Sequence, residues 1–254
     1  IVRFVRHYWK VMGKPYRQHI IGRRRGYHGS TWVAANLGGM LGMHEQGGTL
    51  LPGFHHIQQP YWYDFGGDKS PEDFGLEAAA ELEKKILELG PDNVAAFIGE
   101  PIQGAAGVLM PPSTYWPEVQ RICKKYGIIL ISDEVICGFG RTGKWFGFET
   151  YGYQPDIVNM AKGLSSGYLP IGAIAFSEEL IKPFFDKGGE FYHGMTYDGH
   201  PVASAVALKN IDILQSEKLV DRVAELGPYF NKALASLADP GLLGEEKELG
   251  VWIE

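Results

Sequence analysis

The chain has 254 residues, of which 45% are hydrophobic and 13% aromatic, and its formal net charge is −6. It can bury a sizeable core, and the negative charge provides no basic field for a nucleic-acid partner. Its cysteines, Cys123 and Cys137, lack CxxC or His-rich spacing, which argues against a disulfide framework and a metal site. With no apolar run of membrane-spanning length and no signal-peptide pattern, we expect a cytoplasmic protein without a membrane partner.

The first half of the chain contains three segments with the pattern of a helix. Residues 1–13, IVRFVRHYWKVMG, have helical periodicity from the first position, although the sequence does not begin with Met. Ser70 as an N-cap, Pro71 at the first helical position and a Gly-Pro stop at 90–91 predict a helix between them. Residues 112–127, PSTYWPEVQRICKKYG, predict a second capped helix.

Three short apolar runs predict strands: VAAFIG (94–99), IILIS (128–132) and DIVNMA (156–161). They are nearly continuous rather than alternating, which is typical of strands buried on both faces of a parallel sheet. With helices between them, they predict an α/β fold with a mostly parallel central sheet flanked by helices.

The last part of the chain predicts helices and then a strand. Residues 200–241 have the pattern of two long helices, with Gly227 and Pro228 as a candidate interruption of the second. The final run, GVWIE (250–254), is typical of the start of a strand. Since both ends fall inside a regular pattern, we expect the sequence to be cut from a longer chain.

Ionisable residues come directly after each of the three predicted strands. Glu100 follows the first, Asp133 and Glu134 follow the second, and Lys162 follows the third. Taken singly, each has a plainer interpretation as a helix cap, a turn residue or a surface lysine. Ligands of open α/β sheets bind beyond the carboxyl ends of the strands, so their shared position favours one common site.

The surroundings of Lys162 indicate a cofactor chemistry. Ala161, Gly163 and the run 165–167 are small and leave room for a bulky planar group beside the amine. A lysine in a desolvated pocket loses proton affinity, and its neutral amine can condense with an aldehyde. Pyridoxal phosphate uses this bond and also needs a carboxylate on its pyridine nitrogen, which Asp133 could supply. The sequence therefore predicts a pyridoxal phosphate site.

The run GFGRTG (138–143) fits the dinucleotide pattern G-x-G-x-x-G and follows a strand. The segment behind it, KWFGFETYGYQP (144–155), lacks a helical period, so we expect no helix N-terminus to bind a pyrophosphate there. The glycines are better explained as sharp turns beside the cofactor.

These residues lead to a known family. Residues 131–173 closely resemble the cofactor-binding segment of the class III (ω-amino acid, subgroup II) aminotransferases, which are fold type I pyridoxal phosphate enzymes. RGYHGST (25–31), EPIQGAAGV (100–108) and GMTYDGHPVASAVAL (194–208) resemble other blocks of the same family, in the same order. The resemblance extends over essentially the whole chain and implies the large domain of that fold.

The resemblance implies roles for four residues around the cofactor ring. Lys162 would form the Schiff base with the cofactor aldehyde, and Asp133 would pair with the pyridinium nitrogen. Val135 would pack on one ring face, and Tyr27 would stack on the other and also face the substrate. A broad aromatic face holds a flat cofactor with little loss of side-chain freedom.

Five more residues are implied at the edge of the site. Thr196 would donate a hydrogen bond to the cofactor phosphate of the neighbouring subunit, so a homodimer or higher homo-oligomer is expected. His28 and Glu100 would lie near the cofactor, and Gln103 and Ala105 near the substrate.

Within the family, DEVICGFGRTG (133–143) and RHYWKVMGKP (6–15) resemble the amine:pyruvate and diamine:pyruvate branch, in which Ile136 replaces a common Gln of other branches. This implies amino-group transfer from a primary amine, diamine or ω-amino acid to pyruvate.

We expect a large domain over 1–238, incomplete at its N-terminus, and the start of a truncated C-terminal domain over 239–254. Relatives carry a phosphate-binding turn before the segment that matches residue 1. Two alternatives therefore stay open: an inactive or weakly cofactor-binding fragment, and an aminomutase or racemase on the same fold.

Overall fold

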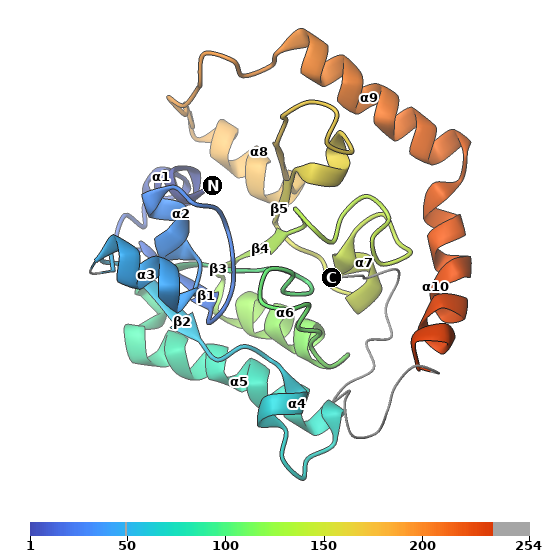
Figure 1. Cartoon of the computed structure of the whole chain (residues 1–254). Helices are drawn as coiled ribbons and strands as arrows, with labels where there is room; N and C mark the ends of the chain where they lie inside the picture. Colours follow the sequence, from blue (N-terminus) through green and yellow to red (C-terminus); the bar gives the residue numbers. More distant parts are fainter. Residues whose placement is uncertain (49, 236–254) are drawn as a thin grey trace.

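A six-stranded sheet runs through the middle of the molecule in the computed structural model, which describes residues 1–48 and 50–235 (Figure 1). The strand order is β2-β1-β3-β4-β5-β6, and the first five strands are parallel while β6 pairs antiparallel with β5. The strands are β1 (His19–Arg23), β2 (Phe54–Ile57), β3 (Val94–Gly99), β4 (Ile129–Asp133), β5 (Ile157–Met160) and β6 (Ala173–Phe176). The predicted α/β fold with a mostly parallel sheet is confirmed.

Helices cover both faces of this sheet. The helices of the described residues are α1 (Val2–Val11), α2 (Trp32–Leu37), α3 (Leu41–Gly47), α4 (Trp62–Phe65), α5 (Pro71–Leu89), α6 (Tyr115–Tyr126), α7 (Gly147–Tyr151), α8 (Glu178–Asp186), α9 (Pro201–Ser216) and α10 (Leu219–Ala235), of which α1, α5, α6 and α8 pack on the sheet. Within the described ranges, no helix is both long enough and apolar enough to span a lipid bilayer.

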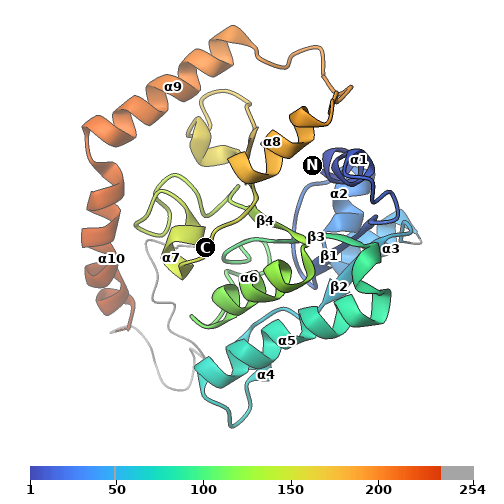
Figure 2. The same cartoon turned by 180° about the vertical axis from the view of Figure 1, so that it is seen from behind.

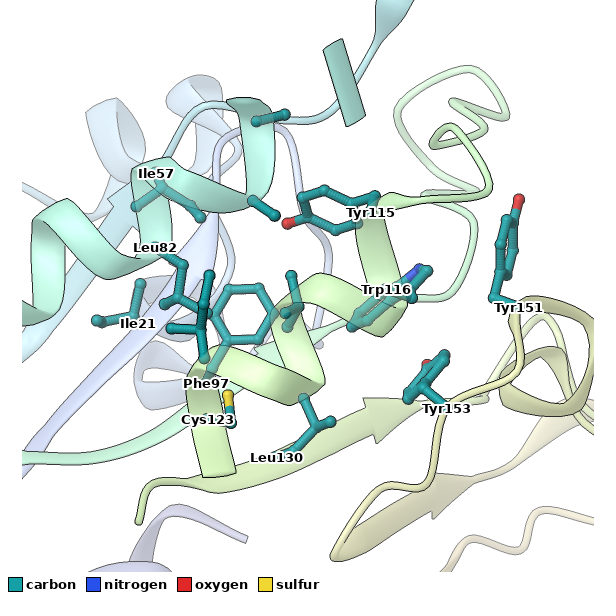
Figure 3. Packing of buried hydrophobic residues seen from close by; sticks show 14 of the residues in the cluster. Ile21, Ile57, Leu82, Phe97, Tyr115, Trp116, Cys123, Leu130, Tyr151 and Tyr153 are labelled. Atoms are coloured by element: carbon teal, nitrogen blue, oxygen red, sulfur yellow. The ribbon is translucent and has the colours of Figure 1, made fainter. Parts of the chain in front are cut away.

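Because side chains alternate along a strand, the buried core is divided between the two faces of the sheet. Ile21, Phe97 and Leu130 pack with α5 and α6 in one buried cluster, which Figure 3 shows. Their neighbours Ile20 and Ile131 belong to a second cluster with α1 and α8. Successive side chains of a strand point to opposite faces, so strands buried on both sides must be apolar at nearly every position. The three predicted strands show this composition.

The predicted helix after Ser70 forms as expected, whereas the second predicted helix lacks the side-chain cap expected at its start. The Ser70 hydroxyl accepts a hydrogen bond from the backbone N–H of Asp73 at 3.1 Å, and Gly90 ends α5. At α6 the predicted cap is only partly present: Gly127 ends the helix at φ 59°, but Thr114 makes no side-chain cap. The Thr114 hydroxyl donates instead to the carbonyl of Glu72 at 2.7 Å, so it joins α6 to α5.

The predicted interruption of the last helix is absent. Helix α10 continues through Gly227 and Pro228, and together with α9 it runs along the outside of the molecule (Figures 1 and 2). The predicted strand at 250–254 and the predicted second domain at 239–254 lie outside the described residues.

Replacing Leu82 with Ala tests the core beneath α5. Leu82 is fully buried, so the substitution should lower the free energy of unfolding by about 2–5 kcal/mol through the lost apolar burial and the cavity left behind. Leu87 lies on the same helix but is 58% exposed, and Leu87→Ala should change the free energy by less than about 0.5 kcal/mol. Urea unfolding of both variants measures the difference, and equal losses would contradict this packing.

Candidate active site

The ionisable residues predicted at strand ends lie along one edge of the sheet. Because β1, β3, β4 and β5 are parallel, the segments that follow them emerge at the same side: Tyr27 after β1, Glu100 after β3, Asp133 at the end of β4 and Lys162 after β5. The strand order reverses between β1 and β3, and ligands of open α/β sheets bind at such a switch point.

Asp133 is buried and hydrogen-bonded through both carboxylate oxygens. Its Oδ2 lies 2.7 Å from Nδ1 of His28, and its Oδ1 accepts the backbone N–H of Val135 at 3.2 Å. The side chains of Asp133 and His28 are only 3% and 2% exposed. The two contacts fix the direction of the carboxylate.

Glu100 is also buried, but its carboxylate binds backbone. Oε1 accepts the N–H of Tyr27 and Oε2 accepts the N–H of Gly104, each at 3.0 Å. Burial raises the pKa of Glu100, while His28 and the Tyr27 N–H oppose that rise. Glu100 therefore holds the turn that carries Tyr27 in place.

The segment after Glu100 packs against the residues after β4. Gln103 is buried, and its side-chain amide donates to the carbonyl of Arg24 at 3.0 Å, while its Oε1 has no partner among the described residues. A Cβ on Gly104 would lie 2.4 Å from Cδ1 of Ile136, so a larger residue there would displace the end of the Ile136 side chain. Ala105 is exposed.

Lys162 lines a cavity of about 540 Å³, but its side chain is exposed, so the desolvated environment expected for its amine is not what the structure shows. It begins a short 3₁₀ turn after β5 with φ 41°, a left-handed conformation that costs a non-glycine residue on the order of 1 kcal/mol. A Cβ on Gly163 would lie 3.0 Å from Cβ of Phe139, so glycine lets this turn approach the loop after β4. The other lining residues are Val135, Ile136, Gly138, Phe139, Gly140, Arg141, Gly163, Ser166, Gly167 and Val223.

The structure brings together some of the predicted site residues. Glu100 binds the N–H of Tyr27, and the next residue along the chain, His28, binds Asp133, while the Tyr27 hydroxyl lies 2.9 Å from the Ser30 hydroxyl. The cavity contains Val135 and Lys162, whereas Thr196 lies in an exposed turn before α9.

The expectation of no helix behind GFGRTG is wrong. The five-residue helix α7 begins at Gly147, too short for its period to stand out in the sequence. Its first two N–H groups, of Gly147 and Phe148, donate to the carboxylate of Glu134 at 2.8 and 2.9 Å. This helix start is therefore already occupied by an anion from the chain itself, and no dinucleotide site follows from it.

Sequence reasoning missed two buried charged residues, Arg23 and Glu134. Arg23 ends β1, lies 5.1 Å over the Trp116 ring and donates from Nη2 to the carbonyl of Glu100. Glu134 was recognised at a strand end but received no role. A signal was available in both cases, since Glu134 comes two residues after the run 128–132 and Arg23 comes two residues after the pair Ile20 and Ile21.

The cysteines are inert features of the core. Both Cys123 and Cys137 are buried, and burial raises the pKa of both thiols.

Solved structures that share this fold include transaminases, which are pyridoxal phosphate enzymes of fold type I. Residues 1–251 match the family described as "Aminotransferase class-III". The chain belongs to the class III aminotransferases.

Individual relatives agree with this assignment. The putrescine–pyruvate aminotransferase of Pseudomonas aeruginosa is 56% identical over 252 residues, which cover 99% of this chain and 55% of that protein. The vanillin aminotransferase of Capsicum chinense is 42% identical, over 98% of this chain and 55% of its own length. The crystal structure of the omega transaminase of Pseudomonas jessenii in complex with PMP superposes with a TM-score of 0.94 at 45% identity, covering 98% of this chain and 56% of that one. The chain spans about half the length of these relatives.

Class III aminotransferases use pyridoxal phosphate, and the residues present fit this cofactor. The cavity offers one primary amine, of Lys162, next to small residues, and a buried carboxylate, of Asp133, ends the strand beside β5. An amine for an aldehyde and a carboxylate for a ring nitrogen are the two groups that the cofactor requires.

The titration of Glu134 predicts a pH dependence of stability. Burial raises its pKa from 4.5 to about 7 in the folded chain, so the folded state binds more protons than the unfolded state between these values. The free energy of unfolding should therefore fall as pH rises from about 4.5 to about 7, by about 3 kcal/mol from this group.

Glu134→Gln should remove the part of this pH dependence that comes from the titration of residue 134. As pH rises across that range, the free energy of unfolding should fall more in the unsubstituted chain than in the variant. Chemical denaturation at a series of pH values measures it, and a difference that does not change with pH would contradict a raised pKa.

Proposed function

We propose that the whole protein transfers an amino group from a primary amine, diamine or ω-amino acid to pyruvate, with pyridoxal phosphate bound at Lys162. The observation that carries this proposal is Lys162 in a cavity walled by the loop after Asp133. The choice of substrates is supported by a relative, 56% identical, that is named for putrescine and pyruvate.

Each residue has a task in this proposal. Lys162 would hold the cofactor through its amine and would move a proton to and from the substrate carbon. Asp133, oriented by His28, pairs with the pyridine nitrogen. When bound, the cofactor supplies an electron sink for the carbon that loses its proton. Val135 and Tyr27 flank the ring, and Glu100 keeps Tyr27 in position through its backbone N–H.

The remaining residues act at the substrate side and across a subunit boundary. Gln103 and Ala105 face the substrate, and the exposed Ala105 leaves space for it. Thr196, in its exposed turn, binds the cofactor phosphate of a neighbouring subunit in a homodimer. Residues 1–238 belong to the large domain in this scheme, and the protein works in the cytoplasm.

Lys162→Ala tests the site directly. Mixed with pyridoxal phosphate and reduced with borohydride, the unsubstituted protein should carry the cofactor on Lys162, as peptide mapping would locate it. The variant should form no adduct in that peptide, because no other amine lies at that position. Lys144→Ala, an exposed lysine of the neighbouring loop, is the matched control and should leave the adduct intact. Labelling of Lys162 no stronger than that of surface lysines would contradict the proposal.

Dependence on pyruvate separates transamination from the aminomutase or racemase alternative. Amine consumption by the whole protein should stop when pyruvate is omitted, because the cofactor would then remain in its aminated form. An aminomutase or racemase needs no keto acid, so consumption or isomerisation that continues unchanged without pyruvate would favour that alternative.

A further inference from the structure

Glu134 is a fully buried carboxylate that three donors reach. The N–H of Gly147 donates to Oε2 at 2.8 Å, while the N–H of Phe148 and the Ser132 hydroxyl donate to Oε1 at 2.9 and 3.0 Å. The Ser132 hydroxyl also lies 2.7 Å from the hydroxyl of the buried Tyr153. A carboxylate with this many donors is held in one orientation and ties the start of α7 to the end of β4.

The backbone of Glu134 extends the same connection toward Lys162. Its N–H donates to the carbonyl of Asn159 in β5 at 2.9 Å, three residues before Lys162, and its carbonyl accepts the N–H of Gly138 at 2.8 Å. One residue thus joins β5, the first turn of the loop after β4, and α7.

Gly147 gives an independent indication that α7 must approach closely. A Cβ at this position would lie 2.7 Å from Cβ of Pro101 and 2.9 Å from Cβ of Cys137, closer than real Cβ atoms come. Any larger residue would push the start of α7 away from Glu134.

The loop between the two ends of this connection forms a wall of the Lys162 cavity. Residues 135–146 leave β4 and enter α7, and Val135, Ile136 and Phe139 of this loop line the cavity. The loop is closed on itself by the N–H of Phe139, which donates to the carbonyl of Trp145 at 2.6 Å. Holding both ends of a loop restricts the positions that its middle can take.

We propose that Glu134 is a positioning residue for the cofactor, because by fixing α7 against β4 it sets the loop 135–146 as the wall on which the ring packs beside Lys162. This inference rests on the proposed function. The three donors matter because burial, and to a smaller extent the charge of Asp133, disfavour the ionised carboxylate and raise the pKa of Glu134.

The test compares Glu134→Gln with Glu149→Gln. Glu149 makes the matched control because it lies on the same helix and accepts the N–H of Phe146 at 2.8 Å, but outside the buried cluster. Each protein is incubated with pyridoxal phosphate, and two quantities are measured: adduct at Lys162 after borohydride reduction, and visible circular dichroism per bound cofactor before it. The second reports how firmly the protein orients the ring. A loss of folded protein would lower the amount of adduct but leave the circular dichroism per bound cofactor unchanged.

Glu134→Gln should lower the circular dichroism per bound cofactor at least about two-fold, since a site that loosens by a fraction of an ångström loses orientation before it loses binding. Without cofactor, the amide hydrogens of Gly147 and Phe148 should exchange about tenfold faster, because one buried charge-assisted hydrogen bond is worth about that factor. Glu149→Gln should change neither quantity.

Circular dichroism per cofactor equal to that of the unsubstituted protein would overturn the positioning role while leaving the proposed function intact. Absence of adduct in the unsubstituted protein would instead overturn the proposed function, and the positioning role with it. If Glu134→Gln does not fold, Ser132→Ala decides the question: it removes one of the three donors, and an unchanged signal per cofactor would overturn the proposal.

Discussion

Three buried carboxylates at the ends of two neighbouring strands determine how the surrounding loops must run. Glu100 follows β3, and Asp133 and Glu134 follow each other at the end of β4. Leaving any of them without partners would cost several kcal/mol, because an ionised group loses its hydration on burial. Their oxygens are satisfied by the turn after β1, the start of the 104–109 turn and the start of α7. The loops around the cavity are thus fixed by the need to supply donors.

Arg23 provides positive charge in the same region. It is 2% exposed, and its guanidinium lies over Trp116 while Nη2 donates to the carbonyl of Glu100. In the part of the chain that the structure describes, its Nε and Nη1 have no hydrogen-bond partner, so the charge is stabilised by the aromatic face and by the nearby carboxylate of Glu100 rather than by a close ion pair.

The elements predicted correctly from the sequence are those with strong local signals. Helix α5 has a cap, a proline and a stop, and β3, β4 and β5 are apolar at nearly every position. Strands β1 and β2 were not predicted: each interrupts its apolar residues with glycine or histidine, and they become strands only by pairing with each other and with β3. The residues of the candidate site also differ in how far a local signal predicts them. Lys162 and Asp133 follow strands and could be placed at one edge of the sheet, but the contact of Asp133 with His28 joins residues 105 positions apart, and no local pattern predicts it.

The adjacent positions of Asp133 and Glu134 explain how one strand end serves two purposes. Leu130 packs on the face of α5 and α6, and Ile131 on the opposite face. Continuing this alternation puts Ser132 and Glu134 on the first face, which agrees with their mutual hydrogen bond, and turns Asp133 to the other face, where His28 meets it. A shift of one residue in the register of β4 would exchange the two carboxylates. The parallel pairing of β4 with β3 and β5 holds that register, so the buried sheet determines which acid faces His28 and which one holds α7.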